Sequence, residues 1–374
     1  MKIYDAIVVG GGIIGGAIAF ELARRNVGVL LLDSQSPGQE ASWAAAGMLA
    51  PPPDSADAIP LVPLGRASLE IYPEFIAAIE EISGEKTAFR PYGAMEVLFG
   101  NDADRKLSTL IAVHHGLGLP AEVLRIEEAF ELEPHLNRDL GAAALLRSEA
   151  SVDNRALTRA VLRAAEASGA EIRSGCPVES VLQAAKRCTG VIAAGERIEG
   201  KSIVIAAGCF SARIEGVSQY APVRPVRGQM VALNSERVEI GHVLRSEHGY
   251  IVPRGSGICL TGSTLENVGF EKRVTPEGIG KILAAAVEIA PGLADASIIE
   301  TWCGLRPDTP DHLPVLGPTD IEGLVIATGH FRNGILLTPI TSRLIADWIT
   351  DQRTIVSWDA FSPMRFADSS RVSA

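Results

Sequence analysis

The chain has 374 residues, 47% of them hydrophobic, and a net charge of −11 from 34 basic and 45 acidic side chains. The excess of acid argues against a nucleic-acid partner, which a basic patch would attract, and it favours solubility. The length is large for one hydrophobic core and predicts two domains. Five cysteines, an odd number without C-x-x-C spacing, argue against a disulfide framework or a zinc site and indicate a reducing cytosol.

Residues 6–33 predict a strand, a glycine turn, a helix and a second strand that ends in an acid. Gly10, Gly12 and Gly15 have the spacing G-x-G-x-x-G, and Asp33 follows the second strand. Gly10 permits a tight turn, Gly12 lets the backbone approach a pyrophosphate, and Gly15 lets the helix pack closely on the strand. The helix N-terminus favours phosphate, and Asp33 can accept hydrogen bonds from ribose hydroxyls. The segment therefore predicts a dinucleotide site.

The same apolar stretch could instead be a signal peptide or a membrane span. Asp5, Glu21, Arg24 and Arg25 interrupt it, no basic segment precedes it, and it is short and rich in glycine. Both alternatives are therefore disfavoured. Because the predicted fold starts almost at Met1, we expect no targeting segment, no membrane span and a cytoplasmic location.

Further blocks of the same kind recur far along the chain. Residues 154–168 predict an amphipathic helix, followed by a short strand at 171–172. Residues 202–208 and 323–329 are continuous apolar strands that end in glycine, and a helix is predicted at 336–350. Continuous apolar strands are typical of a parallel sheet covered on both faces. We therefore expect one discontinuous Rossmann-like domain made of residues 1–88, 148–222 and 301–374.

The intervening segments have a different pattern. Residues 92–99 and 229–264 are rich in β-formers and punctuated by Gly and Pro, which predicts antiparallel strands. Helices are predicted at 104–117 and 277–289 beside that sheet. These segments predict a second, α+β domain, made of residues 89–147 and 223–300, that binds the substrate. The fold class is thus α/β with an inserted antiparallel-sheet domain.

Two further segments suggest what lies in the dinucleotide site. Positions 40–51 are rich in small residues, which alone would indicate ordinary helix packing. Because this segment follows Asp33, its small side chains could instead let a flat ring lie against the backbone. Residues 329–337 form a second turn into a helix, with Arg332 and Asn333 between glycines. This turn could be a plain loop. Its helix N-terminus could instead stabilise negative charge on a reduced flavin.

Together these segments resemble the FAD-dependent D-amino-acid oxidase family, and within it the glycine oxidases of thiamine biosynthesis. The similarity covers nearly the whole chain. Its most specific strings are Ala-Ala-Ala-Gly-Met-Leu-Ala-Pro at 44–51 and Gly-His-Phe-Arg-Asn-Gly-Ile-Leu-Leu at 329–337. Tyr-Ile-Val-Pro-Arg at 250–254 and the more widely shared Gly-Leu-Arg-Pro at 304–307 also match.

The resemblance implies non-covalently bound FAD and a small amino-acid substrate. The substrate contacts that it implies, which are also its catalytic residues, are Tyr250, Arg306 and Arg332. A guanidinium fork such as that of Arg306 suits a carboxylate, because it makes two charge-assisted hydrogen bonds at fixed geometry. The cofactor contacts are Gly10, Gly12, Ile13, Ile14, Gly15, Asp33, Ser34, Ala41, Ser42, Ala46, Gly47, Met48, Val178, Ala207, Gly208, His330, Phe331, Arg332, Asn333, Gly334, Ile335 and Leu336.

The implied reaction is oxidative deamination of glycine and other small amines or D-amino acids. Its products are a keto acid, ammonia and, with molecular oxygen as acceptor, hydrogen peroxide. One alternative is a D-amino-acid or sarcosine-type dehydrogenase of the same family that uses another acceptor. Another is a flavin-binding protein without catalysis, and an NAD-dependent dehydrogenase is disfavoured by the flavin-like segments. The preferred amine, the acceptor and the oligomeric state stay open, and a homo-oligomer is compatible with the sequence.

Among the residues that depart from the family pattern are Asp33, Trp43, Ala207 and Cys303, and Ala207 stands where Thr is frequent. Asp33 stands where Glu is more usual, which shortens the reach to the ribose but keeps the acceptor. Trp43 stands where a small polar residue is common. Cys303 lies close to the position that anchors flavin covalently in the related monomeric sarcosine oxidases, and we expect it to be an ordinary buried thiol instead.

Overall fold

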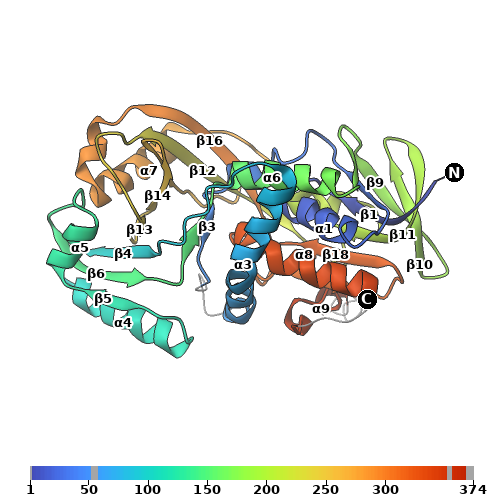
Figure 1. Cartoon of the computed structure of the whole chain (residues 1–374), viewed down its shortest axis with the longest axis horizontal. Coiled ribbons are helices and arrows are strands. Elements are labelled where there is room, and N and C mark those ends of the chain that lie inside the picture. Colours follow the sequence, from blue (N-terminus) through green and yellow to red (C-terminus); the bar gives the residue numbers. More distant parts are fainter. Residues whose placement is uncertain (1, 52–57, 352–355, 368–374) are drawn as a thin grey trace.

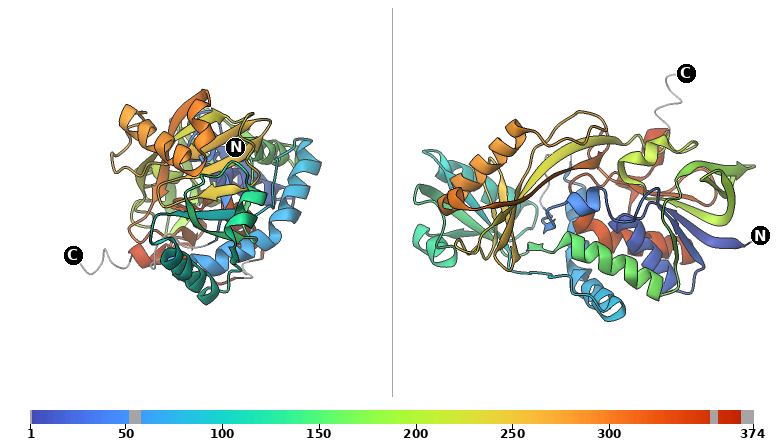
Figure 2. Two further views of the ribbon diagram at one scale, coloured as in Figure 1. Left: turned by 90° about the vertical axis from the view of Figure 1, so that its left-hand side faces the viewer. Right: turned by 90° about the horizontal axis from the view of Figure 1, so that it is seen from above.

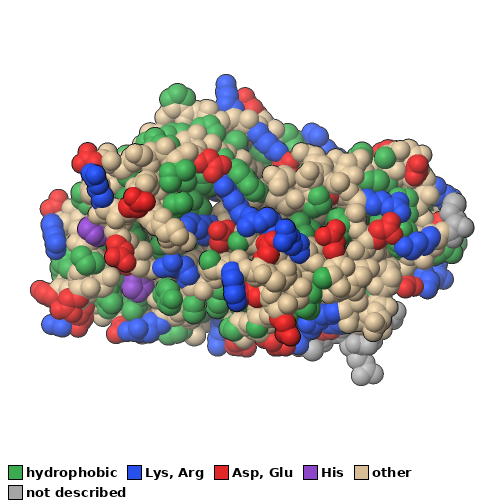
Figure 3. Space-filling model, turned by 45° about the horizontal axis from the view of Figure 1, so that its top comes forward, with side chains coloured by type: hydrophobic (Ala, Val, Ile, Leu, Met, Phe, Trp, Pro, Cys, Tyr) green, Lys and Arg blue, Asp and Glu red, His purple; other side chains and the backbone are tan. Residues whose placement is uncertain are grey.

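The computed structural model describes residues 2–51, 58–351 and 356–367, and two eight-stranded sheets organise them. The sheets lie beside each other along the long axis of the molecule, one in each half (Figure 1). Seen from above, the same two halves form one elongated body (Figure 2). Acidic and basic side chains are interspersed over the face that Figure 3 shows. Among the described residues, no helix has both the length and the apolar character needed to cross a bilayer.

The first sheet is mainly parallel and has the order β17-β18-β11-β1-β2-β8, with β10 and β9 added beside β11. Helices α1, α3, α6 and α8 pack together on one face. The bounds of these strands and helices are β1 Ile3–Val9, β2 Val29–Leu32, β8 Glu171–Arg173, β9 Val178–Ala184, β10 Arg187–Ala193, β11 Glu196–Ile205, β17 Val315–Pro318, β18 Leu324–Thr328, α1 Ile13–Ala23, α3 Leu61–Ser83, α6 Asn154–Ala167 and α8 Gly334–Asp351.

Strand β1 shows why these strands are apolar at every position. Ala6 and Val8 pack against the helices, whereas Ile7 and Val9 lie in a separate core on the opposite face. The β9–β10 hairpin and the short 3-10 helix η2 (Gly208–Arg213) contribute to that second core. The sheet is therefore covered on both sides, as the continuous apolar runs predict.

The second sheet has the order β16-β12-β15-β14-β13-β4-β6-β5. Its pairs are antiparallel except β13 with β4, which is parallel and differs from the wholly antiparallel expectation. The bounds are β4 Ala94–Phe99, β5 Glu122–Leu124, β6 Leu140–Leu146, β12 Arg224–Asn234, β13 Val243–Arg245, β14 Tyr250–Gly255, β15 Ile258–Gly262, β16 Ile298–Asp308, α4 Ala103–Gly116, α5 Ile126–Leu132 and α7 Pro276–Ile289.

Strands β12 and β16 are each 11 residues long and run from the second sheet toward the first (Figure 1). They pair along almost their whole length, from Arg224 with Asp308 to Leu233 with Ile298. The predicted boundary at residue 301 therefore falls inside a strand of the second sheet, because residues 301–308 continue its ladder. Both strands also contact η2, which places their ends beside the first sheet.

The remaining elements are short. They are α2 Ala41–Ala44, β3 Met48–Leu49, β7 Ala150–Ser151, η3 Pro291–Asp295, η4 Asp359–Phe361 and α9 Met364–Ala367. Three of them, α2, β3 and β7, lie between the two halves. Strand β3 pairs with β7, and α2 packs against β16 and α6. The small-residue segment at 40–51 thus lies between the two sheets.

Candidate active site

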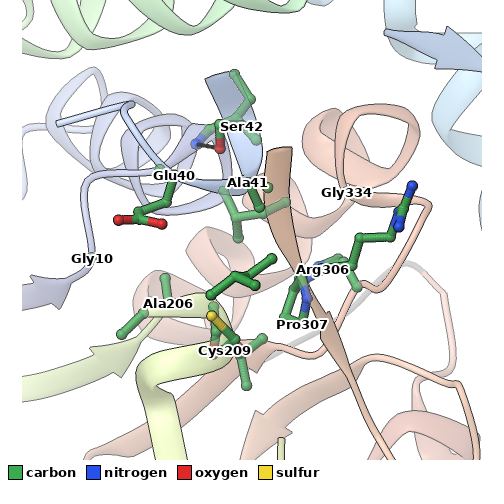
Figure 4. Close-up of a pocket in the computed structure, with 18 of the residues that line it drawn as sticks. Gly10, Glu40, Ala41, Ser42, Ala206, Cys209, Arg306, Pro307 and Gly334 are labelled. Carbon is green, nitrogen blue, oxygen red and sulfur yellow. Dashed lines mark hydrogen bonds between the residues drawn. The ribbon is translucent and has the colours of Figure 1, made fainter. Parts of the chain in front are cut away.

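A cavity of about 370 Å³ lies where the two halves meet. One side is formed where β1, β2, β11 and β18 end at their carboxyl edge, which is where open α/β sheets bind ligands. Gly228 and Met230 of β12, Tyr250 of β14 and Arg306 of β16 form part of the opposite side. Figure 4 shows Gly10 and Ala206 from the first sheet facing Arg306 and Pro307 across this space.

The glycine turn after β1 has the close packing that a dinucleotide site requires. Gly10 has φ of +107°, and a Cβ there would lie 2.5 Å from the carbonyl oxygen of Ala206. A Cβ at Gly15 would overlap the carbonyl oxygen of Gly10, so only glycine lets α1 approach the turn. The backbone amide of Ile13, at the start of α1, donates a hydrogen bond to Ser42 Oγ at 2.9 Å.

Asp33 binds the turn as well as facing the cavity. Its Oδ2 accepts a hydrogen bond from the Gly11 amide at 2.7 Å, and its Oδ1 accepts one from the Gln35 amide at 2.8 Å. A carboxylate has about four acceptor positions, so these two bonds fix its orientation and leave capacity for ribose hydroxyls. The shorter acid therefore fits the role that the sequence predicts.

Small residues are required along the segment from Ala41 to Met48. Gly47 has φ of +72°, and a Cβ there would overlap the carbonyl oxygen of Val152. A Cβ at Gly304 of β16 would overlap that of Ala44. The segment is thus pressed between α6 and β16, and Ala41, Ser42 and Ala44 through Met48 line the cavity. We name residues 41–48 the ring-facing segment.

The guanidinium of Arg306 is held in a fixed orientation. Its Nη2 donates to Ser263 Oγ at 2.8 Å, and its Nη1 donates to the carbonyl of Thr264 at 3.1 Å. A Cβ at Gly228 would overlap Nη1, Nη2 and Cζ, so the guanidinium lies directly over the bare backbone of β12. The buried Tyr250 hydroxyl lies nearby in the cavity and contacts Met230 Sδ at 3.2 Å.

His330 is the only histidine among the described residues lining this cavity. It is 4% exposed, and burial lowers the pKa of its imidazole to about 3. Its Nε2 lies 3.2 Å from Thr341 Oγ1 in α8. His330 is therefore neutral at physiological pH and contributes a packed, uncharged ring beside the N-terminus of α8.

The two ends of the cavity differ in charge. The carboxylates among its described lining residues are Asp33 and Glu40, and both lie at the Gly10 end. Arg306 lies at the other end, next to Ser263. A second cavity of about 400 Å³ adjoins that end and shares Met48, Tyr250, Ser263 and Arg332 with the first. The cationic end therefore suits an anionic group of a small ligand.

Most of the residues predicted from the sequence line this one cavity, including Tyr250, Arg306 and Arg332. Three do not. Gly15 acts through helix packing, Asn333 lines only the adjoining cavity, and Leu336 is buried in α8, where its carbonyl accepts from Ser68. The predicted residues that do line it are Gly10, Gly12, Ile13, Ile14, Asp33, Ser34, Ala41, Ser42, Ala46, Gly47, Met48, Val178, Ala207, Gly208, His330, Phe331, Arg332, Gly334, Ile335, Tyr250 and Arg306.

Sequence reasoning missed several lining residues, notably Gly228, Met230 and Ser263. Gly228 carried a usable signal, because a glycine inside a strand often marks a close approach by another group. Ser263 carried none, since it comes beside Arg306 only through the β12–β15 and β12–β16 pairings. The turn at Cys209–Ile214, which includes Phe210 and Arg213, was also missed.

Cys303 is only half-buried, which differs from the buried thiol that the sequence predicts, and it does not line the cavity, although Gly304 through Pro307 do. Burial raises the pKa of its thiol, which lowers the fraction of reactive thiolate. Its position agrees with a non-covalent cofactor. All five cysteines are free thiols.

These features fit FAD. The glycine turn, the start of α1 and Asp33 provide the backbone approach, the positive helix end and the acceptor that an ADP moiety needs. The ring-facing segment and the start of α8 provide a flat, mostly apolar wall and a second helix N-terminus. No side chain has to move for backbone to face the ligand at Gly10, Gly12 or Gly47.

Known proteins share this sequence and architecture. A glycine oxidase of Geobacillus kaustophilus is 32% identical over 97% of both chains, and its crystal structure superposes with a TM-score of 0.92 over 98% of this chain and 99% of that one. The bifunctional protein ThiO/ThiG of Trichormus variabilis is 35% identical over 97% of this chain. The chain spans about half the length of that relative, 55%. The family model described as FAD dependent oxidoreductase matches residues 5–348, and the chain belongs to that family.

Proposed function

We propose that this protein oxidatively deaminates glycine and other small amines or D-amino acids. The products are a keto acid, ammonia and, with molecular oxygen as acceptor, hydrogen peroxide; from glycine the keto acid is glyoxylate. We also propose that the product supplies thiamine thiazole synthesis, a role supported by the similarity to ThiO/ThiG and by the resemblance to glycine oxidases of thiamine biosynthesis. The free cysteines favour a reducing, cytosolic compartment.

One observation carries this proposal. An oriented guanidinium, that of Arg306, lies in the same cavity as the residues that fit FAD. A zwitterionic amino acid presents a carboxylate, which a guanidinium binds with two parallel hydrogen bonds. The nearly full-length similarity to a glycine oxidase supports a small substrate of this kind.

The residues of the second sheet would bind and orient the substrate. Arg306 pairs with its carboxylate, Tyr250 supplies a hydroxyl beside it, and Arg332 adds a second cation at this end of the cavity. Fixing the carboxylate sets the direction of the Cα–H bond, which is the main contribution that positioning makes to such a reaction. FAD, when bound, supplies the two-electron chemistry.

The described residues at this end of the cavity provide no carboxylate to act as a base. Asp33 and Glu40 lie at the far end, and His330, whose pKa burial strongly lowers, precedes α8 and packs against Thr341 of that helix. We therefore propose that the amine gives up its proton to bulk water as it enters the site, and that the apolar surroundings favour its neutral form. The chain's role is to hold the substrate and exclude water.

The test begins with FAD-loaded wild-type protein mixed anaerobically with glycine, sarcosine, D-alanine or D-proline. We expect the yellow flavin absorbance to bleach with at least one of them and peroxide to form when air is admitted. Bleaching without peroxide would instead indicate a dehydrogenase with another acceptor. A flavin that no amine bleaches would refute the proposal.

The matched variants are Arg306→Ala and Arg306→Lys. Removing the guanidinium should raise KM by at least about 100-fold, since a hydrogen bond to a charged group is worth roughly 1.5–3 kcal/mol and two are lost. Lysine keeps the charge but not the fork, so it should recover only part of that loss. An unchanged KM for Arg306→Ala would remove Arg306 from the site.

A further inference from the structure

A second arginine of the second sheet, Arg254, reaches across to the first half of the molecule. It lies near the end of β14 at an irregularity in the β14–β15 pairing, between Pro253 and Gly255. Bulges of this kind redirect a side chain and are common beside active sites. The guanidinium donates from Nη1 to the carbonyl of Val152 at 2.7 Å and from Nη2 to the carbonyl of Ala46 at 2.8 Å.

Arg254 binds backbone carbonyls and an amide, and among the described residues no carboxylate lies within ion-pair distance of it. Its third bond goes from Nη2 to Asn154 Oδ1 at 2.6 Å. Burial lowers the pKa of its guanidinium to about 10, and Arg155 and Arg90 act in the same direction while Asp153 opposes them. A buried cation is costly unless its donors are satisfied, so a site with three well-made bonds has a specific purpose.

Those three bonds converge on the ring-facing segment. Ala46 belongs to it, and Val152 donates its own amide to the carbonyl of Gly47 at 2.9 Å. Asn154 is 1% exposed, and its Nδ2 donates hydrogen bonds to the carbonyls of Ser42 at 2.7 Å and Trp43 at 3.0 Å. Arg254 and Asn154 therefore hold the segment at both ends, at residues 42–43 and at residues 46–47.

The strand that carries Arg254 also carries Tyr250, four residues earlier. A clamp at Arg254 thus fixes the strand of the substrate side against the wall of the cofactor side. We propose that Arg254 is a positioning residue that sets the ring-facing segment, and with it the flavin ring, relative to the substrate strand β14. The cofactor part follows from membership of the FAD family, and the substrate part rests on the proposed function.

The test compares Arg254→Met and Arg254→Lys with the wild-type protein. FAD affinity is measured by titrating apoprotein and following flavin fluorescence, and the ring's surroundings by visible circular dichroism. We expect Arg254→Met to weaken FAD binding by roughly ten-fold or more, the equivalent of one hydrogen bond to a charged group. It should also alter the circular dichroism and speed amide hydrogen exchange in residues 41–48. Lysine should restore part of each change, because one ammonium can still donate to these carbonyls.

Arg365 provides a matched control. Its guanidinium donates to the backbone carbonyls of Phe361, Ser362, Leu313 and Pro314 and, unlike that of Arg254, also pairs with the Asp311 carboxylate at 2.7 Å; none of these residues lines the cavity. Arg365→Met should lower stability while leaving FAD affinity and the flavin spectrum unchanged. If Arg254→Met does not fold, Asn154→Ala tests the same clamp from its other member and should give the same loss of affinity.

The outcomes separate this proposal from the proposed function. If the wild-type protein binds FAD but oxidises no amine, the substrate part fails and the affinity comparison still tests the clamp. If Arg254→Met matches the wild type in FAD affinity, spectrum and exchange, the clamp is refuted even when glycine is oxidised normally. Equal spectral changes in Arg365→Met would refute it too, because they would show a general effect of lost stability.

Discussion

At the scale of single residues, the geometry of the candidate active site depends on the absence of a side chain at Gly228 as much as on the side chains that line the cavity. Arg306 occupies its position because residue 228 has no side chain, and the guanidinium lies over that backbone. Ser263 and the carbonyl of Thr264 then hold the fork. The orientation of the Arg306 guanidinium therefore depends on β12, on β16 and on the two residues that follow β15.

Gly228→Ala tests this dependence. The added methyl group overlaps three atoms of the Arg306 guanidinium, so the fork must shift away from its Ser263 and Thr264 partners. We expect KM for glycine to rise by about ten-fold with a smaller change in FAD affinity, since one well-oriented charged bond is worth roughly 1.5 kcal/mol. Steady-state kinetics and FAD titration measure both quantities.

Gly280→Ala in α7 serves as the comparison for that variant. A Cβ there meets no atom within 4 Å, and the helix should gain up to about 1 kcal/mol from the better helix former. Its kinetics should match the wild type. A Gly228→Ala enzyme with the same KM as Gly280→Ala would show that the guanidinium is not held as described.

The sequence predicts individual residues where a local motif supplies the geometry. Gly10, Gly12 and Asp33 are of this kind, because turn, helix and acid are all within one unit. Arg306 was identified only through the resemblance. Gly228 and Ser263 escaped because their closeness to Arg306 arises from strand pairings over some 40 to 80 residues of chain, which no local pattern encodes.

At the scale of elements, we expect the contact between α1 and the glycine turn to determine the affinity for FAD. Gly15→Ala should place a Cβ on the carbonyl oxygen of Gly10 and push α1 away from the turn. We expect at least a ten-fold weaker FAD affinity, because the amides at the helix start no longer face the pyrophosphate together. Titration of apoprotein with FAD gives the value.

The neighbouring Gly16→Ala separates this effect from simple crowding. A Cβ at Gly16 meets only side-chain atoms of Leu162 and Val161, at 3.1 and 3.2 Å, which can adjust. It should lower thermal stability slightly and leave FAD affinity nearly unchanged. Equal losses of affinity in the two variants would contradict a specific role for the Gly15–Gly10 contact.

Elements with a strong period were predictable, including α8 with Pro339 inside it, but α3, which contains two prolines, was not predicted. The helices at α6 and α7 lie within one or two residues of their predicted bounds. The 23-residue helix α3 was missed, because Pro73 lies inside it and Pro63 near its start, and proline normally marks a break. Packing against α8 and α6 stabilises that helix in spite of its sequence.

At the scale of the whole molecule, pH-dependent stability has a definite origin at the second sheet. Glu149, which is 4% exposed, accepts a hydrogen bond from Arg245 at 2.9 Å, and Arg245 also pairs with Glu96 at 2.6 Å. Burial raises the pKa of the Glu149 carboxyl from 4.5 to about 7, while Arg245 opposes the rise and Glu96 adds to it. Two carboxyl groups thus share one buried cation.

The sign of the effect follows from linkage. As pH rises from about 4.5 to about 7, the native state keeps a proton on Glu149 that the unfolded chain has lost, so the contribution of Glu149 to the unfolding free energy falls. Glu149→Gln cannot titrate. We expect the difference in unfolding free energy, wild type minus variant, to decrease by on the order of 3 kcal/mol across this window.

Urea unfolding of both proteins at several pH values between 4.5 and 8 measures that difference. Comparing the two proteins cancels other titrating groups such as His330, whose lowered pKa acts in the opposite direction. A difference that stays constant with pH would show that Glu149 is ionised throughout.

The arrangement of the two sheets could be predicted only in part from the sequence. The two kinds of sheet followed from the contrast between continuous apolar runs and punctuated β-rich segments. Strand order and the parallel β13–β4 pair could not be read, since they depend on which distant segments meet. The predicted boundary at residue 301 lies inside β16, a strand that continues from Ile298 to Asp308.

The unbroken ladder of β12 and β16 has a mechanical consequence. Two paired strands of 11 residues resist bending, so the halves that hold cofactor and substrate behave as one stiff unit instead of closing around a hinge at this point. Efforts to accept bulkier amines should accordingly reshape the adjoining cavity near His248 and Arg332 and leave that pair of strands intact.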